Sequence, residues 1–271
     1  MKKLFTILAA IMVAMLALTG CGGTDQKAAQ DTKVLKVGAT AVPHAEILEQ
    51  VKDDLAKEGI DLQIVEFSDY VQPNLATNDK ELDANYFQHI PYLDNFVEEH
   101  PEVKLVNAGG IHIEPMGIYS KKVKDLKDLA EGASVAIPND PTNGGRALAL
   151  LEKAGLIKLK DGVGIKATVQ DIVDNPKNLK VQELEAAQVP RTLDDVDAAV
   201  INSNFAMQVQ LNPVKDSLII EDASSPYVNI VAVRTGDENR PEIQALMKAL
   251  KSDKVKKFIE EKYAGAVVAT F

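Results

Sequence analysis

The chain contains one cysteine, Cys21, among its 271 residues. A single cysteine excludes an intrachain disulfide and a cluster of thiolate metal ligands. The chain also lacks a long hydrophobic run: the apolar stretch at residues 4–18 is fifteen residues long, whereas a spanning helix needs about 20. We therefore expect neither a disulfide framework nor a transmembrane helix.

Catalytic signatures are missing as well. The sequence has no GxSxG and no recognisable serine, histidine and acid arrangement, and "NGGR" at residues 143–146 lacks both the Walker lysine and the GxGxxG spacing. The acidic pairs Asp194/Asp195 and Glu98/Glu99 lie in polar helical surroundings, which is typical of a solvated face. We expect a protein that is not an enzyme and has no cofactor; an enzyme is the minor alternative.

The N-terminus is typical of an export signal. Lys2 and Lys3 precede the apolar run, and the run ends in "LTGC", which resembles a bacterial lipobox, where cleavage makes the cysteine the lipid-bearing N-terminus. We expect a signal peptide at residues 1–20 and a lipidated, flexible tether at residues 21–33, because "GGTDQKAAQDTK" has no apolar periodicity. The lipid on Cys21 would hold the protein on the extracytoplasmic face of a membrane of the cell envelope.

The charge of the chain is strongly negative. The formal net charge is −10, and loss of the two lysines of the leader changes it to −12 (−10 − 2). This balance disfavours nucleic acid and anionic lipid as direct partners. The lipid anchor is then the expected link to the membrane.

Strand-like and helical patterns alternate along the remaining body of roughly 240 residues. This alternation predicts an α/β fold of mainly parallel sheets covered by helices. The predicted strands span residues 34–40, 60–67, 133–137, 180–184, 198–201 and 228–234. The predicted helices span residues 43–58, 143–154, 241–250 and 253–263.

The body is long enough for two lobes. Two extended segments, residues 111–120 and 227–234, flank a self-contained middle block, and we expect them to be the crossings between the lobes. We assign residues 34–116 and 230–271 to lobe 1, and residues 117–229 to lobe 2.

Aromatic residues are scarce but clustered. They make up 5% of the chain, yet "DANYFQHIPYLDNF" (residues 83–96) holds four rings and a histidine. Six of the twelve aromatic residues after the leader fall within thirty positions, namely Phe67, Tyr70, Tyr86, Phe87, Tyr92 and Phe96. Core packing accounts for Phe67 and Phe96, but tyrosines among amides and histidine would leave polar tips that need partners. The wall of a ligand pocket is the better interpretation.

Arginine is also scarce, with four residues against 26 lysines. Arg146 follows the helix breakers of "PNDPTNGG", and we expect Thr142 or Asn143 to cap the helix, which places Arg146 in its first turn. There a cation opposes the helix dipole. A bound carboxylate would reverse that disadvantage and suits the guanidinium fork. An exposed arginine or an internal salt bridge is equally compatible with these residues alone.

Amides and histidines supply further candidates. Asn202 and Asn204 follow a buried strand, and Asn229 lies within an apolar β run, where a buried amide needs a partner such as an ammonium group. Helix capping is the alternative for Asn204. His89 could instead bind a metal together with His44, His100 or His112. Without a second cysteine or an HExxH motif we expect no metal site.

Several longer stretches together resemble the methionine-binding lipoproteins that serve methionine ABC importers. They are "DANYFQHIPYL", "IPNDPTNGGRALALLEKAGLIKLKDG", "NPKNLKVQELEAAQVPR", "DDVDAAVINSNFA" and "SPYVNIVAVR". The resemblance extends over the body from "LKVGATAVPHAEIL" to the C-terminal helices. It implies a two-lobed periplasmic-binding-protein fold of the second type, with the ligand in a cleft between the lobes. It also implies a monomer that delivers methionine, L-methionine in the first place, to the permease of an ABC importer.

The resemblance also implies the roles of individual residues. Those implied to contact the ligand are Tyr70, Phe87, His89, Tyr92, Asn143, Arg146, Asn202, Asn204 and Asn229. The first four would surround the thioether, Arg146 would bind the α-carboxylate with Asn143 nearby, and the other asparagines would meet the polar end of the amino acid. Phe205 stands where the family often has tyrosine, so that hydroxyl is absent. Tyr86, next to Phe87, would point to the opposite face of its strand.

Other ligands stay open. Members of the same family could prefer D-methionine, another apolar amino acid or a dipeptide such as glycyl-methionine. A metal receptor and an enzyme on the same two-lobed fold are the alternatives from other classes.

Overall fold

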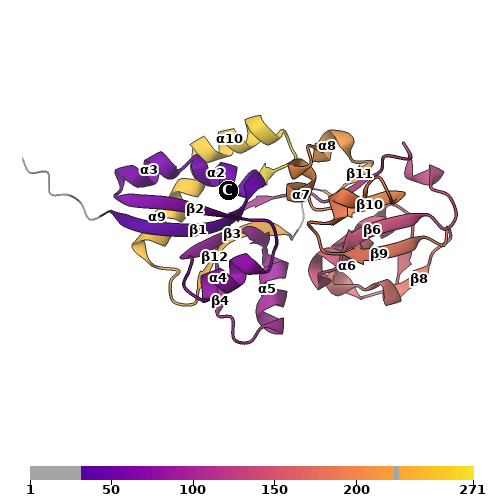
Figure 1. Cartoon of the computed structure of the whole chain (residues 1–271), viewed down its shortest axis with the longest axis horizontal. Helices are drawn as coiled ribbons and strands as arrows, with labels where there is room; N and C mark the ends of the chain where they lie inside the picture. The colour runs from indigo at the N-terminus through magenta and orange to yellow at the C-terminus, as the bar shows by residue number, and fades with distance from the viewer. Residues whose placement is uncertain (1–31, 223–225) are drawn as a thin grey trace, which may run out of the picture. The chain divides into compact units, whose positions relative to one another are not determined.

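A computed structural model describes residues 32–222 and 226–271 of the chain (Figure 1). The predicted signal peptide, Cys21 and nearly all of the predicted tether lie outside these ranges. Within them, every helix is too short or too polar to cross a membrane. Lys33, the last residue of the predicted tether, already begins the first strand, and Lys33–Phe271 form one unit.

The described strands belong to a six-stranded sheet, a five-stranded sheet and a two-stranded pair. The first sheet has the order β13-β4-β12-β3-β1-β2 and consists of β1 (Lys33–Thr40), β2 (Ile60–Phe67), β3 (Ala84–His89), β4 (Leu105–Ile113), β12 (Val228–Arg234) and β13 (Val268–Ala269). The second has the order β11-β5-β10-β6-β9 and consists of β5 (Gly117–Tyr119), β6 (Ser134–Pro138), β9 (Lys180–Leu184), β10 (Ala198–Ile201) and β11 (Ile219–Ile220). The pair is formed by β7 (Lys158–Leu159) and β8 (Ile172–Asp174).

The α/β class and the two-lobed arrangement are confirmed, but both sheets are mixed rather than mainly parallel. In the first sheet β1 is parallel to β2 and β3, whereas β12 is antiparallel to β3 and β4. In the second sheet β6 is parallel to β9 and β10, whereas β5 is antiparallel to β10 and β11. The route of the chain explains the difference, because β4 leads out of the first sheet and β12 leads back into it, so these neighbours run in opposite directions.

The chain passes between the two sheets twice, once between β4 and β5 and once between β11 and β12. These two crossings are bonded to each other, since the Glu221 backbone N–H donates to the Met116 carbonyl at 2.9 Å. Because β12 starts at Val228, Asn229 belongs to the first sheet, whereas the predicted boundary placed it at the end of lobe 2.

Helices cover both sheets. They are α2 (Glu46–Glu49), α3 (Lys52–Lys57), α4 (Gln72–Asn78), α5 (Ile90–Glu99), α6 (Pro141–Lys153), α7 (Ser203–Gln208), α8 (Pro213–Asp216), α9 (Pro241–Leu250) and α10 (Asp253–Tyr263), with short helical turns at η1 (Ala41–Ala45), η2 (Leu126–Asp128), η3 (Gly164–Lys166), η4 (Val169–Asp171) and η5 (Val189–Thr192). The single helix predicted for residues 43–58 is divided into η1, α2 and α3. Gln50 and Val51 donate to carbonyls three residues back, which tightens one turn, and Ile47, Leu48 and Leu55 are buried in the core.

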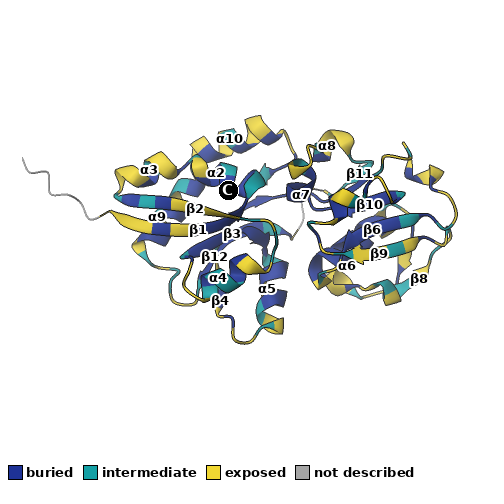
Figure 2. Cartoon of the chain, in the orientation of Figure 1, coloured by how far each residue is buried: buried dark blue, intermediate teal, exposed yellow. Residues whose placement is uncertain are grey.

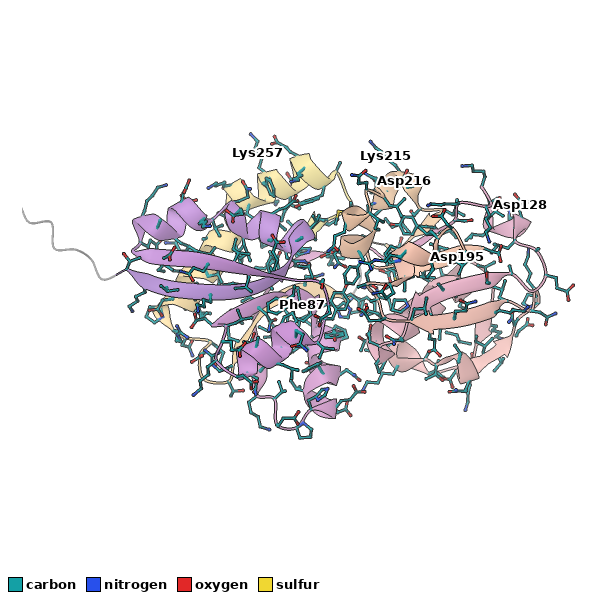
Figure 3. All side chains as sticks on the ribbon, viewed as in Figure 1. Phe87, Asp128, Asp195, Lys215, Asp216 and Lys257 are labelled. Atoms are coloured by element: carbon teal, nitrogen blue, oxygen red, sulfur yellow. The ribbon has the colours of Figure 1, made fainter. Side chains whose placement is uncertain are left out.

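Each sheet has its own buried core (Figure 2). Helices α2, α3, α9 and α10 pack on one face of the first sheet and α5 on the other. In the second sheet α6 packs on one face, with Leu148 and Leu151 buried, while α7 packs on the other. Charged side chains such as Lys257 and Asp195 project from the surface, whereas Phe87 lies inside (Figure 3). Buried polar residues lie between the two sheets, outside these apolar cores.

Candidate functional site

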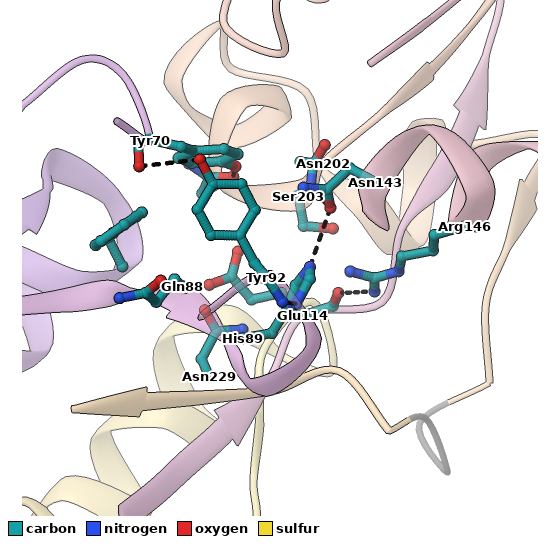
Figure 4. A pocket seen from close by; sticks show the side chains of 12 residues that line it. Tyr70, Gln88, His89, Tyr92, Glu114, Asn143, Arg146, Asn202, Ser203 and Asn229 are labelled. Carbon is teal, nitrogen blue, oxygen red and sulfur yellow. Dashed lines mark hydrogen bonds between the residues drawn. The ribbon is translucent and has the colours of Figure 1, made fainter. Parts of the chain in front are cut away.

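Side chains from both sheets line a cavity between the sheets (Figure 4). The structure brings together all nine residues predicted to contact a ligand, since every one of them lines this cavity. The lining also contains three residues that the sequence did not single out, namely Gln88, Glu114 and Ser203.

Aromatic rings form one side of the cavity. Tyr70 lies against Phe87, Tyr92 and Phe205, with ring centroids 5.8, 5.7 and 4.9 Å apart. The Tyr70 hydroxyl donates to Asn204 Oδ1 at 2.6 Å, and the Tyr92 hydroxyl donates to the Tyr70 carbonyl at 3.1 Å. Both hydroxyls therefore have partners, and the ring faces remain for apolar contact. Phe205 is buried against Tyr70 outside the lining.

Strand β3 contributes Phe87, Gln88 and His89 to the cavity lining. Tyr86 points to the opposite face from Phe87 and packs into the core of the first sheet, as predicted. Tyr86 there forms a hydrogen bond with His112 Nδ1. The strand thus separates a core tyrosine from its cavity neighbours.

His89 links the two sheets as a neutral donor. It caps helix α5, where its Nδ1 accepts from the Tyr92 backbone N–H at 3.1 Å. Its proton is therefore on Nε2, which lies 3.1 Å from Asn143 Oδ1 on α6. Burial, together with the nearby charge of Arg146, lowers the pKa of His89 to about 3. The ring stays uncharged at neutral pH.

The start of helix α6 differs from the prediction. Asp140 is the N-cap instead of Thr142 or Asn143, and its carboxylate accepts from the Asn143 backbone N–H at 2.9 Å and from Asn143 Nδ2 at 3.0 Å. Pro141 occupies the first helical position, where a missing N–H costs nothing. Arg146 consequently lies in the second turn and not in the first, so the dipole argument applies less strongly to it.

The Asp140 cap also orients Asn143. With Nδ2 held by the carboxylate, Asn143 Oδ1 faces the cavity and accepts from His89 Nε2 and from Asn202 Nδ2, the latter at 2.8 Å. The glycines that follow serve close packing, because a Cβ at Gly145 would lie 2.2 Å from the Ile165 carbonyl oxygen. Close packing at Gly145 therefore explains a glycine in "NGGR" without a bound phosphate.

Arg146 is buried, with 3% of its surface exposed, and lines the cavity while holding an internal salt bridge. Its Nε donates to the two Glu221 carboxylate oxygens at 2.8 and 3.0 Å, and its Nη2 donates to Glu221 and, at 2.8 Å, to the Glu114 carbonyl. The guanidinium carbon lies 4.1 Å from the centroid of the Tyr227 ring. Within the described part of the chain, these contacts occupy Nε and Nη2 and leave Nη1 for a further acceptor.

Glu114, which sequence reasoning missed, places a buried carboxyl group at the cavity. Its Oε1 lies 3.1 Å from His44 Nε2 and 2.8 Å from His112 Nε2. His44 Nε2 also lies 3.0 Å from Asn229 Oδ1, so it faces two acceptors and carries the proton. The alternation of His112 and Glu114 in "IHIEP", directly before a crossing, was the available signal.

Burial shifts the pKa values of Glu114, His44 and His112. It raises the pKa of Glu114, and it lowers the pKa of His44 to about 4 and that of His112 to about 3. Neutral imidazoles therefore donate N–H groups to the carboxylate. The Nδ1 atoms face the hydroxyls of Thr40 and Tyr86, so each ring is held from both ends.

The same three groups, His44, His112 and Glu114, are the set among the described residues that could hold a metal ion, with ligand atoms within 4.8 Å of one another. His89 is outside this set, and His100 lies near the surface, 3.3 Å from Glu102. Because the nitrogens of His44 and His112 already have partners on both sides, the set is a closed hydrogen-bond network.

Two buried polar atoms at the cavity have no hydrogen-bond partner in the described part of the chain. They are Asn202 Oδ1, an acceptor, and Asn204 Nδ2, a donor. A buried polar group of this kind costs about 1–3 kcal/mol when unpaired. The cavity thus presents both an acceptor and a donor to whatever occupies it.

A cavity between two α/β sheets that are joined by two crossings, with lining residues from both, defines the class of bilobed substrate-binding proteins. Within that class, the model of the NlpA lipoprotein family matches residues 35–271, and the chain belongs to this family.

Relatives and solved structures agree with this assignment. The chain is 45% identical to the methionine-binding lipoprotein MetQ of Bacillus subtilis strain 168, over 99% of this chain and 98% of that protein. It is also 45% identical to the D-methionine-binding lipoprotein MetQ of Escherichia coli K12, over 95% and 94% of the two chains. A solved structure of a nutrient binding protein from Burkholderia cenocepacia bound to methionine matches it with a TM-score of 0.84 at 50% identity, over 88% of this chain and all 100% of the other.

Proposed function

We propose that this chain is the substrate-binding lipoprotein of an ABC importer and that it captures methionine in the cavity between its sheets. The observation that carries the proposal is the two-sided chemistry of that cavity, with aromatic rings on one side and the buried charges of Arg146 and Glu114 on the other. The names of the relatives, which describe methionine-binding lipoproteins, support it.

The polar groups match an amino-acid zwitterion. Arg146 Nη1 binds the α-carboxylate, and Asn204 Nδ2 is placed to add a second donor. The ammonium group finds acceptors in the Glu114 carboxylate and in Asn202 Oδ1, with Asn229 beside them. A ligand with both charges therefore pairs groups that are costly to leave unpaired when buried.

The aromatic side suits the thioether. Phe87 and the rings of Tyr70 and Tyr92 offer faces and edges to the flexible methionine side chain. Contact between sulfur and an aromatic ring is favourable by about 0.3 to 1.5 kcal/mol. His89, held neutral, positions Asn143 and adds no charge to this side.

Binding stabilises the arrangement in which the two sheets are close. His89 to Asn143 and Tyr70 to Asn204 are direct hydrogen bonds between groups on opposite sides of the cavity. A ligand that contacts both sides favours this arrangement through its differential affinity, and micromolar to nanomolar binding corresponds to about −8 to −12 kcal/mol. The bound form, a monomer held on the extracytoplasmic side of the membrane by lipid on Cys21, then docks on the permease.

The decisive experiment is to denature the purified protein that lacks residues 1–20 and to identify the released small molecule by mass spectrometry. We expect intact methionine, and titration of the emptied protein with L-methionine, D-methionine and glycyl-methionine then ranks the ligands. Release of glycyl-methionine or preferential binding of the D-enantiomer would change the ligand within the same class. Release of zinc or manganese alone, or turnover of methionine instead of its recovery, would contradict the proposal.

A further inference from the structure

Glu221 lies in the second crossing and binds Arg146 from outside the methionine cavity. It is absent from the lining of that cavity, whereas Arg146 lines both it and a second cavity whose wall contains Glu221 and Tyr227. Arg146 therefore separates the two cavities. Glu221 reaches the guanidinium from one of them, and a ligand would reach it from the other.

The carboxylate of Glu221 holds a defined edge of the guanidinium. It accepts from Nε, at 2.8 and 3.0 Å, and from Nη2, which is the two-pronged geometry that fixes a planar fork in orientation. The Tyr227 ring lies 4.1 Å from the guanidinium carbon and restricts it further. Because Glu221 occupies Nε and Nη2, Nη1 lies on the other edge of the guanidinium. The Arg146 side chain points toward the other residues that line the cavity (Figure 4).

Glu221 also connects Arg146 to both crossings. Its Oε2 accepts from the Met116 backbone N–H at 2.9 Å, and its own backbone N–H donates to the Met116 carbonyl at 2.9 Å. Arg146 Nη2 donates in addition to the Glu114 carbonyl in the first crossing. The position of the guanidinium is thus defined by the two segments that join the sheets, and the side chain of Glu221 is only 13% exposed.

We propose that Glu221 is a positioning residue for methionine binding, which presents Arg146 Nη1 to the ligand carboxylate. The inference rests on the proposed function of the cavity. Glu221 does not compete with the ligand, because it occupies a different edge of the guanidinium. It also keeps the arginine paired when the cavity is empty, which avoids the cost of an isolated buried charge.

The test compares two ligands on matched variants. Calorimetric titrations with methionine and with methioninol, which has the same side chain and ammonium group but no carboxylate, are made on the parent, Glu221→Ala and Glu221→Gln. Asp222→Asn is the control, because Asp222 is the next residue and pairs at the surface with Lys153 of the same helix as Arg146. We expect Glu221→Ala to weaken methionine binding by roughly tenfold or more while methioninol changes by less than about threefold. Glu221→Gln should fall between, and the control should match the parent.

Equal losses for both ligands would reduce Glu221 to a purely structural role, and tighter methionine binding by either variant would show competition; each result overturns the inference. A second readout uses Arg146→Ala as background, in which removal of Glu221 should have no further effect on methionine affinity. If Glu221→Ala does not fold, judged by thermal melting, the near-isosteric Glu221→Gln decides. Absence of methionine binding by the parent would refute the proposed function instead, so the two failures are distinguishable.

Discussion

The two sides of the cavity differ in how completely their polar groups are paired. On the side of the first sheet, the hydroxyls of Tyr70 and Tyr92 and both nitrogens of His89 have hydrogen-bond partners within the protein. On the side of the second sheet, buried atoms of Asn202 and Asn204 have no partner among the described residues. The polar groups on the first side are therefore paired within the protein, whereas the second side leaves a donor and an acceptor for the proposed ligand.

This asymmetry assigns different tasks to the lobes. A wall whose hydrogen bonds are already made costs little to reorganise when a ligand arrives, which favours shape recognition. Unpaired groups gain most from a ligand that supplies the missing donor and acceptor. Affinity should therefore depend most on the charged and amide groups, and selectivity for the side chain on the rings.

The largest effect is expected for Arg146→Ala. The ligand carboxylate then loses its charged partner, and we expect methionine binding to weaken by about 2 to 5 kcal/mol in calorimetric titration. Arg191→Ala, at an exposed arginine in the same lobe, is the control and should bind like the parent. Near-parental affinity of Arg146→Ala would remove Arg146 from the site and with it the contrast between the two sides.

The next effect is expected for Glu114→Gln, which keeps the shape of the side chain and removes its charge. The ammonium group loses a charged acceptor, so methionine and methioninol should both bind more weakly by about 1.5 to 3 kcal/mol. Glu102→Gln, at the acidic partner of His100 near the surface, is the matched control. A variant that loses affinity for methionine but not for methioninol would place the ammonium group elsewhere.

A smaller effect concerns the pH dependence of the free energy of unfolding, to which the buried histidines on the side of the first sheet contribute. The pKa of His89 is lowered to about 3 and that of His44 to about 4, so below pH 6.5 the unfolded chain takes up protons that the folded chain does not. The free energy of unfolding should therefore fall as pH decreases from about 6.5 toward 4, by up to about 1.4 kcal/mol per pH unit for each histidine. Burial raises the pKa of Glu114 and Asp140, which opposes this trend.

The contribution of one histidine is isolated by a variant. Urea unfolding of His89→Asn between pH 7.5 and 5 should show a shallower dependence than the parent. His100→Asn, at a half-exposed histidine, should keep the parental dependence. A His89→Asn curve parallel to that of the parent would mean that the ring of His89 is protonated equally in both states.

The smallest effect tests the rings. Norleucine replaces the methionine sulfur by a methylene group, and we expect it to bind more weakly by about 0.3 to 1.5 kcal/mol. Phe87→Leu should narrow this difference, and Phe67→Leu, at a ring outside the cavity lining, should leave it unchanged. Equal binding of methionine and norleucine by the parent would show that the wall recognises shape alone.

Much of the secondary structure could be predicted from local patterns. The strands Ile60–Phe67, Lys180–Leu184 and Val228–Arg234 and the helices Pro241–Leu250 and Asp253–Tyr263 have the predicted bounds. Each has strong periodicity, and its ends carry turn or capping residues, so the information is contained in neighbouring residues. At the start of α6 the local pattern was insufficient. It predicted Thr142 or Asn143 as the N-cap, whereas Asp140 is the N-cap in the structure.

The candidate site was predictable only in part. The aromatic and amide clusters indicated residues that line the cavity, because their polarity is unusual for a core. Glu221 was missed because nothing in its immediate sequence distinguishes it from a surface acid, and Glu114 was missed because its alternation with His112 in "IHIEP" was not used. Their importance arises from His44, His112 and Arg146, which lie between 2 and 75 positions away.

The sequence by itself determined the α/β class, the bounds of several strongly periodic elements and the chemical character of the residues that line the cavity, because these depend on periodicity and residue type over short distances. The tertiary structure decided the antiparallel pairings, the pairing of Arg146 with Glu221 and the buried network around Glu114. Burial and proximity set the energy of a charge, and both are created only when distant segments of the chain are brought together.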